Sequence, residues 1–212
     1  MRALFGIVLA LATFGGAHLA QAHPHVWAQV RSVVVYKDGQ VAGLRHEWRF
    51  DENFTESIKE EFDKNGDGKL AKSELDELVK LNMAALEDFD FFTIVRSEGK
   101  KLAFGKPFDF SMEHVDKQIV LRFTVALKTA LRAGQAFAFT VEDPTFYTSM
   151  QFVQEADSVA LGTGAPAGCR ISLGDRNPAT AEERALVEAF SDGITGGVAM
   201  AGNQKMAHVS CG

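Results

Sequence analysis

The fold is decided first by residues 26–50, VWAQVRSVVVYKDGQVAGLRHEWRF, where two runs rich in β-branched and aromatic residues flank Asp38-Gly39. Such runs are typical of β-strands. Asp-Gly is a preferred pair for a two-residue hairpin turn, because both turn positions take a positive φ. We therefore predict an antiparallel β-hairpin at the start of the domain.

Beyond this hairpin the pattern becomes helical once and then returns to strands. Between residues 53 and 90, the apolar residues Phe54, Ile58 and Phe62 recur every four positions, which marks one helix face. Residues 180–191, TAEERALVEAFS, predict another helix, with Thr180 as N-cap and Glu183 completing a capping box. Further strand patterns lie at residues 91–104, 118–127, 135–143, 148–153 and 168–173.

These elements together predict an α+β fold. We expect one domain over residues 23–212, built as an antiparallel β-sandwich-like domain. A helix–calcium loop–helix hairpin is expected as an insertion at residues 53–90, and a C-terminal helix follows the last strands.

Residues 1–22 have the pattern of an export signal. Arg2 precedes the short apolar run ALFGIVLALATF, and AQA at residues 20–22 fits a cleavage site. A membrane anchor is the less favoured alternative, because the run is too short to span a bilayer comfortably. We expect cleavage near Ala22 and a periplasmic or secreted mature chain that does not span a membrane. The net charge of −6 argues against nucleic-acid binding, which needs a basic patch.

The chain contains two cysteines, Cys169 and Cys211. In an oxidising compartment such a pair favours a disulfide over two free thiols. The bond would close a loop of 43 residues. The chain-entropy model gives about 4 kcal/mol of stabilisation for a loop of that length.

Residues 63–74, DKNGDGKLAKSE, match the EF-hand calcium loop D-x-N-x-D-G-x(5)-E. Ca²⁺ prefers about six to eight oxygen ligands, and Gly68 permits the sharp turn that wraps the loop around the ion. The alternative interpretation is an acidic surface turn capped by its glutamate. The predicted calcium ligands are Asp63, Asn65, Asp67, Lys69 through its carbonyl, and Glu74 through both oxygens.

The sequence contains no second loop of this kind, although EF-hands usually pair through the strand at position 8. We expect Leu70, the residue at position 8, to dock on the β-domain instead. With three carboxylates the loop should bind Ca²⁺ with a dissociation constant on the order of 10⁻⁶ to 10⁻³ M. Outside the cytoplasm calcium is abundant, so the ion is expected to act as a structural clip more than as a switch.

Cleavage after Ala22 would make HPHVWAQV the new N-terminus. His23 would then present an α-amine and an imidazole, which together can chelate one metal ion as in histidine-brace copper sites. The square-planar motif with histidine at position 3 is excluded, because Pro24 has no N–H. We expect His23, His25 and Glu52 to bind Ni²⁺, Zn²⁺ or Cu²⁺, and a solvated, frayed terminus is the alternative.

The predicted hairpin register decides whether Glu52 or His46 lies near enough to His25 to bind the same metal ion. A two-residue turn at residues 38 and 39 pairs residues whose numbers add to 77, so Glu52 faces His25 and His46 faces Arg31. His46 then lies roughly 20 Å along the strand from His25, at about 3.4 Å per residue. We therefore expect His46 to be a buried core histidine and not a metal ligand.

The order of several motifs resembles one known family. The motifs are HPHVW after the export signal, GLRHEWRFDENF, the single calcium loop, FDFFT, EDPTFY and the late cysteines. Over nearly all of residues 23–212 the chain resembles uncharacterised exported proteins described as a periplasmic component of ABC-type transport systems, domain-of-unknown-function family 1007. The resemblance implies an association with transition-metal transport of nickel, cobalt or zinc, beside a membrane exporter.

We therefore expect an exported calcium-binding protein that serves as an accessory in periplasmic Ni, Co, Zn or Cu handling or transport. Its expected partners are metal ions and a membrane metal transporter. One alternative is a structural adaptor of such a transporter, with calcium used only for stability. The other is a copper-brace enzyme. The sequence has no nucleophile elbow, no HExxH and no phosphate-binding loop, so we expect that it is not an enzyme.

Overall fold

The strands predicted first, β1 (Val26–Lys37) and β2 (Gln40–Phe50), form an antiparallel hairpin around Asp38-Gly39. The structure is a computed structural model that describes residues 25–155, 157–175 and 205–212. The two turn residues have φ values of 50° and 72°, the left-handed values that this turn requires. The predicted hairpin is confirmed.

The register of the hairpin differs from the predicted one. The pairing shifts by one residue between Val35 and Tyr36, because Ala42 is an extra residue in β2. Such a β-bulge displaces every pair beyond it by one position. His46 consequently faces Ser32 and not the arginine that was expected.

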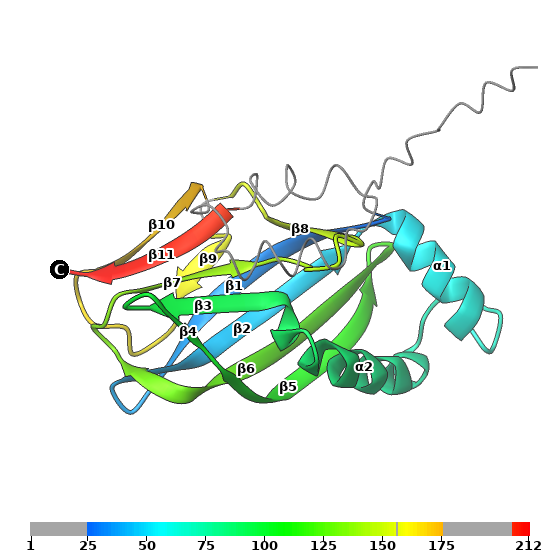
Figure 1. The fold of residues 1–212 in the computed structure, drawn as a ribbon. Coiled ribbons are helices and arrows are strands. Elements are labelled where there is room, and N and C mark those ends of the chain that lie inside the picture. Colours follow the sequence, from blue (N-terminus) through cyan, green and yellow to red (C-terminus); the bar gives the residue numbers. More distant parts are fainter. Residues whose placement is uncertain (1–24, 156, 176–204) are drawn as a thin grey trace, which may run out of the picture.

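The described strands form two sheets (Figure 1). In sheet A the strand order is β5-β6-β2-β1-β8, and β9 also pairs with β1. Besides β1 and β2, this sheet contains β5 (Phe104–Val115), β6 (Gln118–Arg132), β8 (Thr148–Phe152) and β9 (Val159–Leu161). In sheet B the order is β10-β11-β7-β3-β4, formed by β10 (Cys169–Asp175), β11 (Lys205–Cys211), β7 (Phe137–Val141), β3 (Thr93–Ser97) and β4 (Lys100–Leu102). β8 and β9 run parallel to β1, and the other paired strands are antiparallel.

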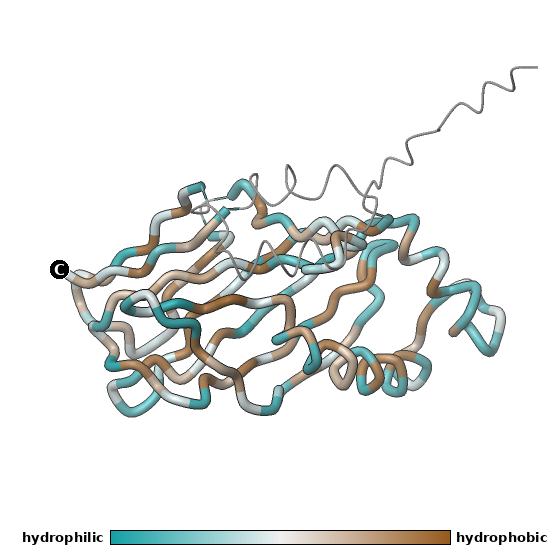
Figure 2. Tube along the Cα trace, in the orientation of Figure 1, coloured by the Kyte–Doolittle hydropathy of each residue, from teal (hydrophilic) through white to brown (hydrophobic). Residues whose placement is uncertain are grey.

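One hydrophobic core joins the two sheets. Val30, Leu44 and Phe123 of sheet A and Phe139 of sheet B are each no more than 1% exposed and belong to the same cluster. The rings of Phe139 and Phe152 lie 6.0 Å apart and connect β7 to β8. Figure 2 shows hydrophobic segments along the strands and hydrophilic ones at the turns and around the loop between the helices. Burial of apolar surface between the sheets is therefore the main source of stability.

Two α-helices, α1 (Glu52–Phe62) and α2 (Lys72–Glu87), lie together at one end of the sheets, and a short 3₁₀ turn, η1 (Asp90–Phe92), follows them (Figure 1). α1 packs on β6 and β1, and α2 packs on β5 and η1, so each helix makes its main contacts with elements other than its neighbouring helix. Within the residues that the structure describes, neither these nor any other helix is long and apolar enough to cross a membrane.

The expected α+β class is wrong. Strands hold 54% of the described residues, in two sheets, so the fold is mostly β. The expected helix–calcium loop–helix hairpin is not formed as a paired unit, because α1 packs on β6 and β1 and α2 packs on β5, all strands of sheet A. The expected C-terminal helix at residues 180–191 lies outside the described residues, and the last described element, β11, is a strand.

Candidate functional site

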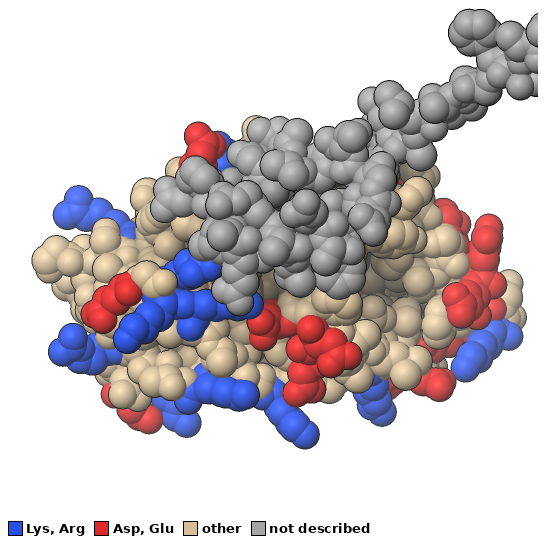
Figure 3. All heavy atoms as spheres, in the orientation of Figure 1, with Lys and Arg blue, Asp and Glu red and all other residues tan. Residues whose placement is uncertain are grey.

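The segment at residues 63–74, named here the acidic loop, connects the end of α1 to the first turn of α2. α1 begins where the Asp51 carboxylate accepts the Phe54 N–H at 3.0 Å, the usual N-cap bond. At the end of the acidic loop, the Ala71 N–H donates to Glu74 Oε2 at 2.8 Å, and this bond fixes the start of α2. Figure 3 shows acidic side chains, with basic ones among them, gathered at the end of the molecule that carries α1 and the acidic loop.

The first residue of the acidic loop organises its backbone. Asp63 Oδ1 accepts the N–H groups of Gly66 at 2.8 Å and of Asp67 at 3.2 Å. Asp63 Oδ2 accepts the Gly68 N–H at 2.8 Å. Gly66 and Gly68 have φ values of 72° and 76°, which a residue with a Cβ adopts only with strain. The sharp turn expected at Gly68 is therefore present.

The other predicted side-chain ligands also face the loop backbone. Asn65 Oδ1 accepts the Asp67 N–H, and Asp67 Oδ1 accepts the Lys69 N–H, both at 2.8 Å. Glu74, only 8% exposed, accepts the Lys64 N–H through Oε1 at 2.9 Å. An ionised carboxylate offers about four acceptor positions, so these bonds leave each carboxylate with capacity to bind a cation.

Among the described residues, no group of three or more His, Cys, Asp or Glu side chains lies close enough together to hold a metal ion. Asp63, Asp67 and Glu74 therefore do not form such a group. An EF-hand loop differs from such a cluster, because an amide oxygen, a backbone carbonyl and water complete its ligand set. In this loop those groups would be Asn65 and the carbonyl of Lys69.

Leu70, in the middle of the acidic loop, docks on the β-domain as expected. Its side chain is 5% exposed and belongs to the core cluster. Its N–H donates to Nδ1 of His114, on β5, at 3.3 Å. The sequence did not identify His114 as part of this region. The signal that could have found it is the alternation of β5, which places His114 on the same face as the buried Met112.

The predicted terminal metal ligands are only partly within the described residues. His23 lies outside them. His25 is exposed, donates its backbone N–H to the carbonyl of Tyr147 at 2.9 Å, and has its ring centroid 5.2 Å from that of Tyr147. Glu52 is the exposed first residue of α1, so it does not continue β2 opposite His25 as expected. The neighbouring carboxylate of Asp51 already accepts two backbone N–H groups.

His46 is the buried core histidine that the sequence predicted. It has no solvent exposure, and its Nδ1 lies 2.8 Å from Ser32 Oγ. Its Nε2 lies 3.4 Å from Thr93 Oγ1, on sheet B. Burial lowers the pKa of His46 from 6.5 to about 3, so the ring is neutral at ordinary pH. The buried neutral ring therefore links sheet A to sheet B through the two hydroxyl groups at its nitrogens.

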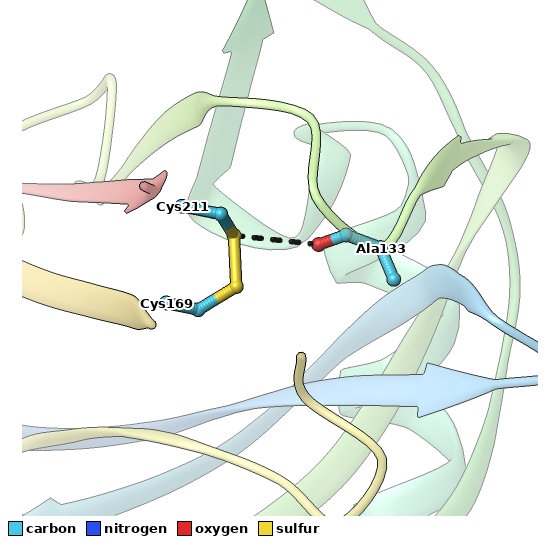
Figure 4. Close-up of a disulfide and its surroundings, with 3 residues drawn as sticks. All are labelled: Ala133, Cys169 and Cys211. Carbon is cyan, nitrogen blue, oxygen red and sulfur yellow. Dashed lines mark hydrogen bonds between the residues drawn. A yellow bond between two sulfur atoms is a disulfide. The ribbon is translucent and has the colours of Figure 1, made fainter. Parts of the chain in front are cut away.

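The predicted disulfide is confirmed. Cys169 and Cys211 are directly paired residues of β10 and β11, and their sulfur atoms are bonded (Figure 4). Sγ of Cys211 also lies 3.7 Å from the carbonyl oxygen of Ala133 (Figure 4). The bond closes the chain across 42 residue positions.

Fold and site together define a class: a mostly β, two-sheet protein with an acidic, glycine-bent loop between two helices docked on one sheet. The chain belongs to the DUF1007 family, described as "Protein of unknown function", whose model matches residues 8–204. It is also similar to an uncharacterised 15.5 kDa protein in the trpE 3′ region of Spirochaeta aurantia, with 35% identity over 99 residues that cover 47% of this chain and 70% of that protein. The resemblance to this family is therefore confirmed, and neither description states a ligand or a role in transport.

Proposed function

We propose that the protein binds one Ca²⁺ ion in the acidic loop. The observation that carries the proposal is the orientation of the loop oxygens. Side-chain oxygens of Asp63, Asn65, Asp67 and Glu74 all accept backbone N–H groups of the acidic loop itself. These are the side chains that the EF-hand pattern assigns to the ion.

The ion would act mainly as a structural clip in a chain exported from the cytoplasm. It would offset the repulsion among three carboxylates and fix the direction in which α2 leaves α1. With three carboxylates, the expected dissociation constant is on the order of 10⁻⁶ to 10⁻³ M. At a free Ca²⁺ concentration of about one hundred times that constant, binding would stabilise the folded state by about 2.7 kcal/mol.

Isothermal titration calorimetry tests the proposal on the mature chain with its N-terminus verified by mass spectrometry. The wild type should bind one Ca²⁺. Glu74→Gln and Asp67→Asn should each bind at least about tenfold more weakly, because each removes a charged oxygen ligand. Glu60→Gln is the matched control, since Glu60 is an exposed residue of α1 and the charge change is the same. Absence of binding to the wild type, or unchanged affinity in Glu74→Gln, would overturn the proposal.

We also propose that His23, His25 and Glu52 bind Ni²⁺, Zn²⁺ or Cu²⁺ once the export signal is removed, as part of an accessory role beside a membrane metal transporter. One arrangement supports this second proposal. The Trp27 N–H donates to Asp51 Oδ2 at 2.8 Å, and the Asp51 N–H donates to the Trp27 carbonyl at 2.9 Å. These two bonds join the start of β1 to the start of α1, where His25 and Glu52 are exposed.

Titration of Ni²⁺ into the mature chain tests this site. Binding should be lost when one residue is added before His23, because the added residue displaces the α-amine. His25→Ala should weaken it, whereas Ca²⁺ binding should be unchanged in both variants. Calcium binding without any Ni²⁺, Zn²⁺ or Cu²⁺ binding would contradict the terminal site and favour the adaptor role. Turnover with copper and a reductant would favour the enzyme alternative.

A further inference from the structure

The acidic loop meets β5 at an edge of sheet A. In that sheet β5 pairs with β6 on one side, and α2 packs on it. Along β5, Met112 is 6% exposed and faces the core, whereas Glu113 is exposed and forms an ion pair with Arg122 at 2.8 Å. His114 is on the Met112 face of the strand, and its Nδ1 accepts the Leu70 N–H. An imidazole of the sheet therefore holds the middle of the loop.

The helix before the loop is attached to the same place. Thr55 of α1 has no solvent exposure, and its Oγ1 accepts the Ile119 N–H at 3.0 Å while donating to the Asp51 carbonyl at 2.9 Å. Ile119 is the cross-strand partner of His114. The end of the β5–β6 hairpin, defined as residues 114–119, thus holds α1 through one strand and the loop through the other.

The bond to His114 has a direct consequence for a calcium ligand. The N–H of Leu70 and the carbonyl of Lys69 belong to the same peptide group. A trans peptide group is planar, so its N–H and C=O point in opposite directions. Fixing the N–H toward His114 turns the Lys69 carbonyl away from β5. That carbonyl is the position-7 ligand of the proposed calcium site.

We propose that His114 is a positioning residue that orients the Lys69 carbonyl for Ca²⁺, and that the end of the β5–β6 hairpin takes the place of a second EF-hand. This inference rests on the proposed calcium site. Because Nδ1 accepts the Leu70 N–H, the ring hydrogen lies on Nε2. Nε2 is buried and has no hydrogen-bond partner among the described residues. The ring's polar contact with the loop is therefore made through Nδ1 alone.

Calcium calorimetry on three variants of the full mature chain tests the inference. His114→Leu removes the acceptor and should weaken Ca²⁺ binding by about threefold to tenfold, which corresponds to the net free energy of one neutral hydrogen bond. His114→Asn carries an oxygen on Cγ, where the imidazole carries Nδ1, and should restore affinity to within about twofold of wild type. Glu113→Gln, on the opposite face of β5, is the control and should bind as wild type. Hydrogen exchange at the Leu70 amide should accelerate in His114→Leu and not in His114→Asn.

Each outcome distinguishes the inference from the proposed function. A wild type that binds Ca²⁺ and a His114→Leu variant with a lower melting temperature but the same affinity would show a merely structural role and overturn the inference alone. A wild type that does not bind Ca²⁺ would overturn both. If His114→Leu does not fold, His114→Gln is used in its place. The side-chain oxygen of glutamine is one carbon further from the backbone than that of asparagine. Equal affinity of the Asn and Gln variants would then refute the positioning role.

Discussion

Ser32 Oγ and His46 Nδ1 lie 2.8 Å apart at a place where neither residue is more than 1% exposed. The β-bulge at Ala42 creates this pair, because without it His46 would face the arginine of β1. The bond is buried on the side of sheet A where His46 Nε2 approaches Thr93 Oγ1 of sheet B, and its donor and acceptor have no access to bulk water. Removing one partner would leave the other unsatisfied, which is costly in a core.

We predict that His46 makes the protein less stable in acid. The pKa of His46 is lowered to about 3 in the folded state from 6.5. The unfolded chain therefore takes up a proton as the pH falls below 6.5, while the folded chain does not, and stability is lost until the pH reaches about 3. The free energy of unfolding should be about 2 kcal/mol lower at pH 5 than at pH 7.5 from this residue. Urea unfolding of wild type and His46→Gln at both pH values measures the difference, and parallel pH profiles would contradict it.

Gly43→Ala should destabilise the protein strongly. A Cβ at Gly43 would lie 2.1 Å from the carbonyl oxygen of Val125 on β6, and that oxygen belongs to a backbone held in the sheet. Forcing extra atoms into a packed region costs about 1–3 kcal/mol or more. Gly134→Ala is the control, because a Cβ there meets no atom within 4 Å. Thermal melting compares the two, and an equal effect would exclude the close approach as the cause.

Reduction of the disulfide should lower stability without changing the fold of the strands. Replacing Cys169 and Cys211 by serine should reduce the free energy of unfolding by about 4 kcal/mol, because the unfolded chain regains the freedom of a long loop. Unfolding in urea, with and without dithiothreitol, measures this effect. The reductant should destabilise the wild type and leave the double serine variant unchanged. Sensitivity of the double variant to dithiothreitol would point to a different cause.

Asp143→Asn should destabilise the turn before β8. Asp143 is 5% exposed and accepts the Thr145 N–H at 2.8 Å, the Thr145 hydroxyl at 2.7 Å and the Thr148 N–H at 2.8 Å. An asparagine has one oxygen and faces at least one of these donors with its NH₂ group, at a cost of about 1–3 kcal/mol. Glu155→Gln, which breaks an exposed ion pair with Arg31, should cost less than about 1 kcal/mol. Equal losses in the two variants would contradict the role of Asp143.

Some features of this protein follow from residues close together in the sequence. Asp38-Gly39 sets the hairpin because a two-residue turn depends only on the φ values its own residues tolerate. Gly68 takes the positive φ that the loop pattern requires for the same local reason. The pair Cys169 and Cys211 was predictable because the chain has no other cysteine. The burial of His46 followed from its place among the apolar residues of β2.

Other features were decided only by tertiary structure. The extra residue at Ala42 accompanies the close approach of Gly43 to Val125, and that contact exists only once β6 lies beside β2. The parallel pairing of β8 and β9 with β1 and the packing of both helices on strands of sheet A likewise bring together segments that are distant in the sequence. The meeting of Leu70 with His114 joins residues 44 positions apart. Local patterns specify turns and periodicity, whereas such contacts depend on which buried surfaces fit together across the whole domain.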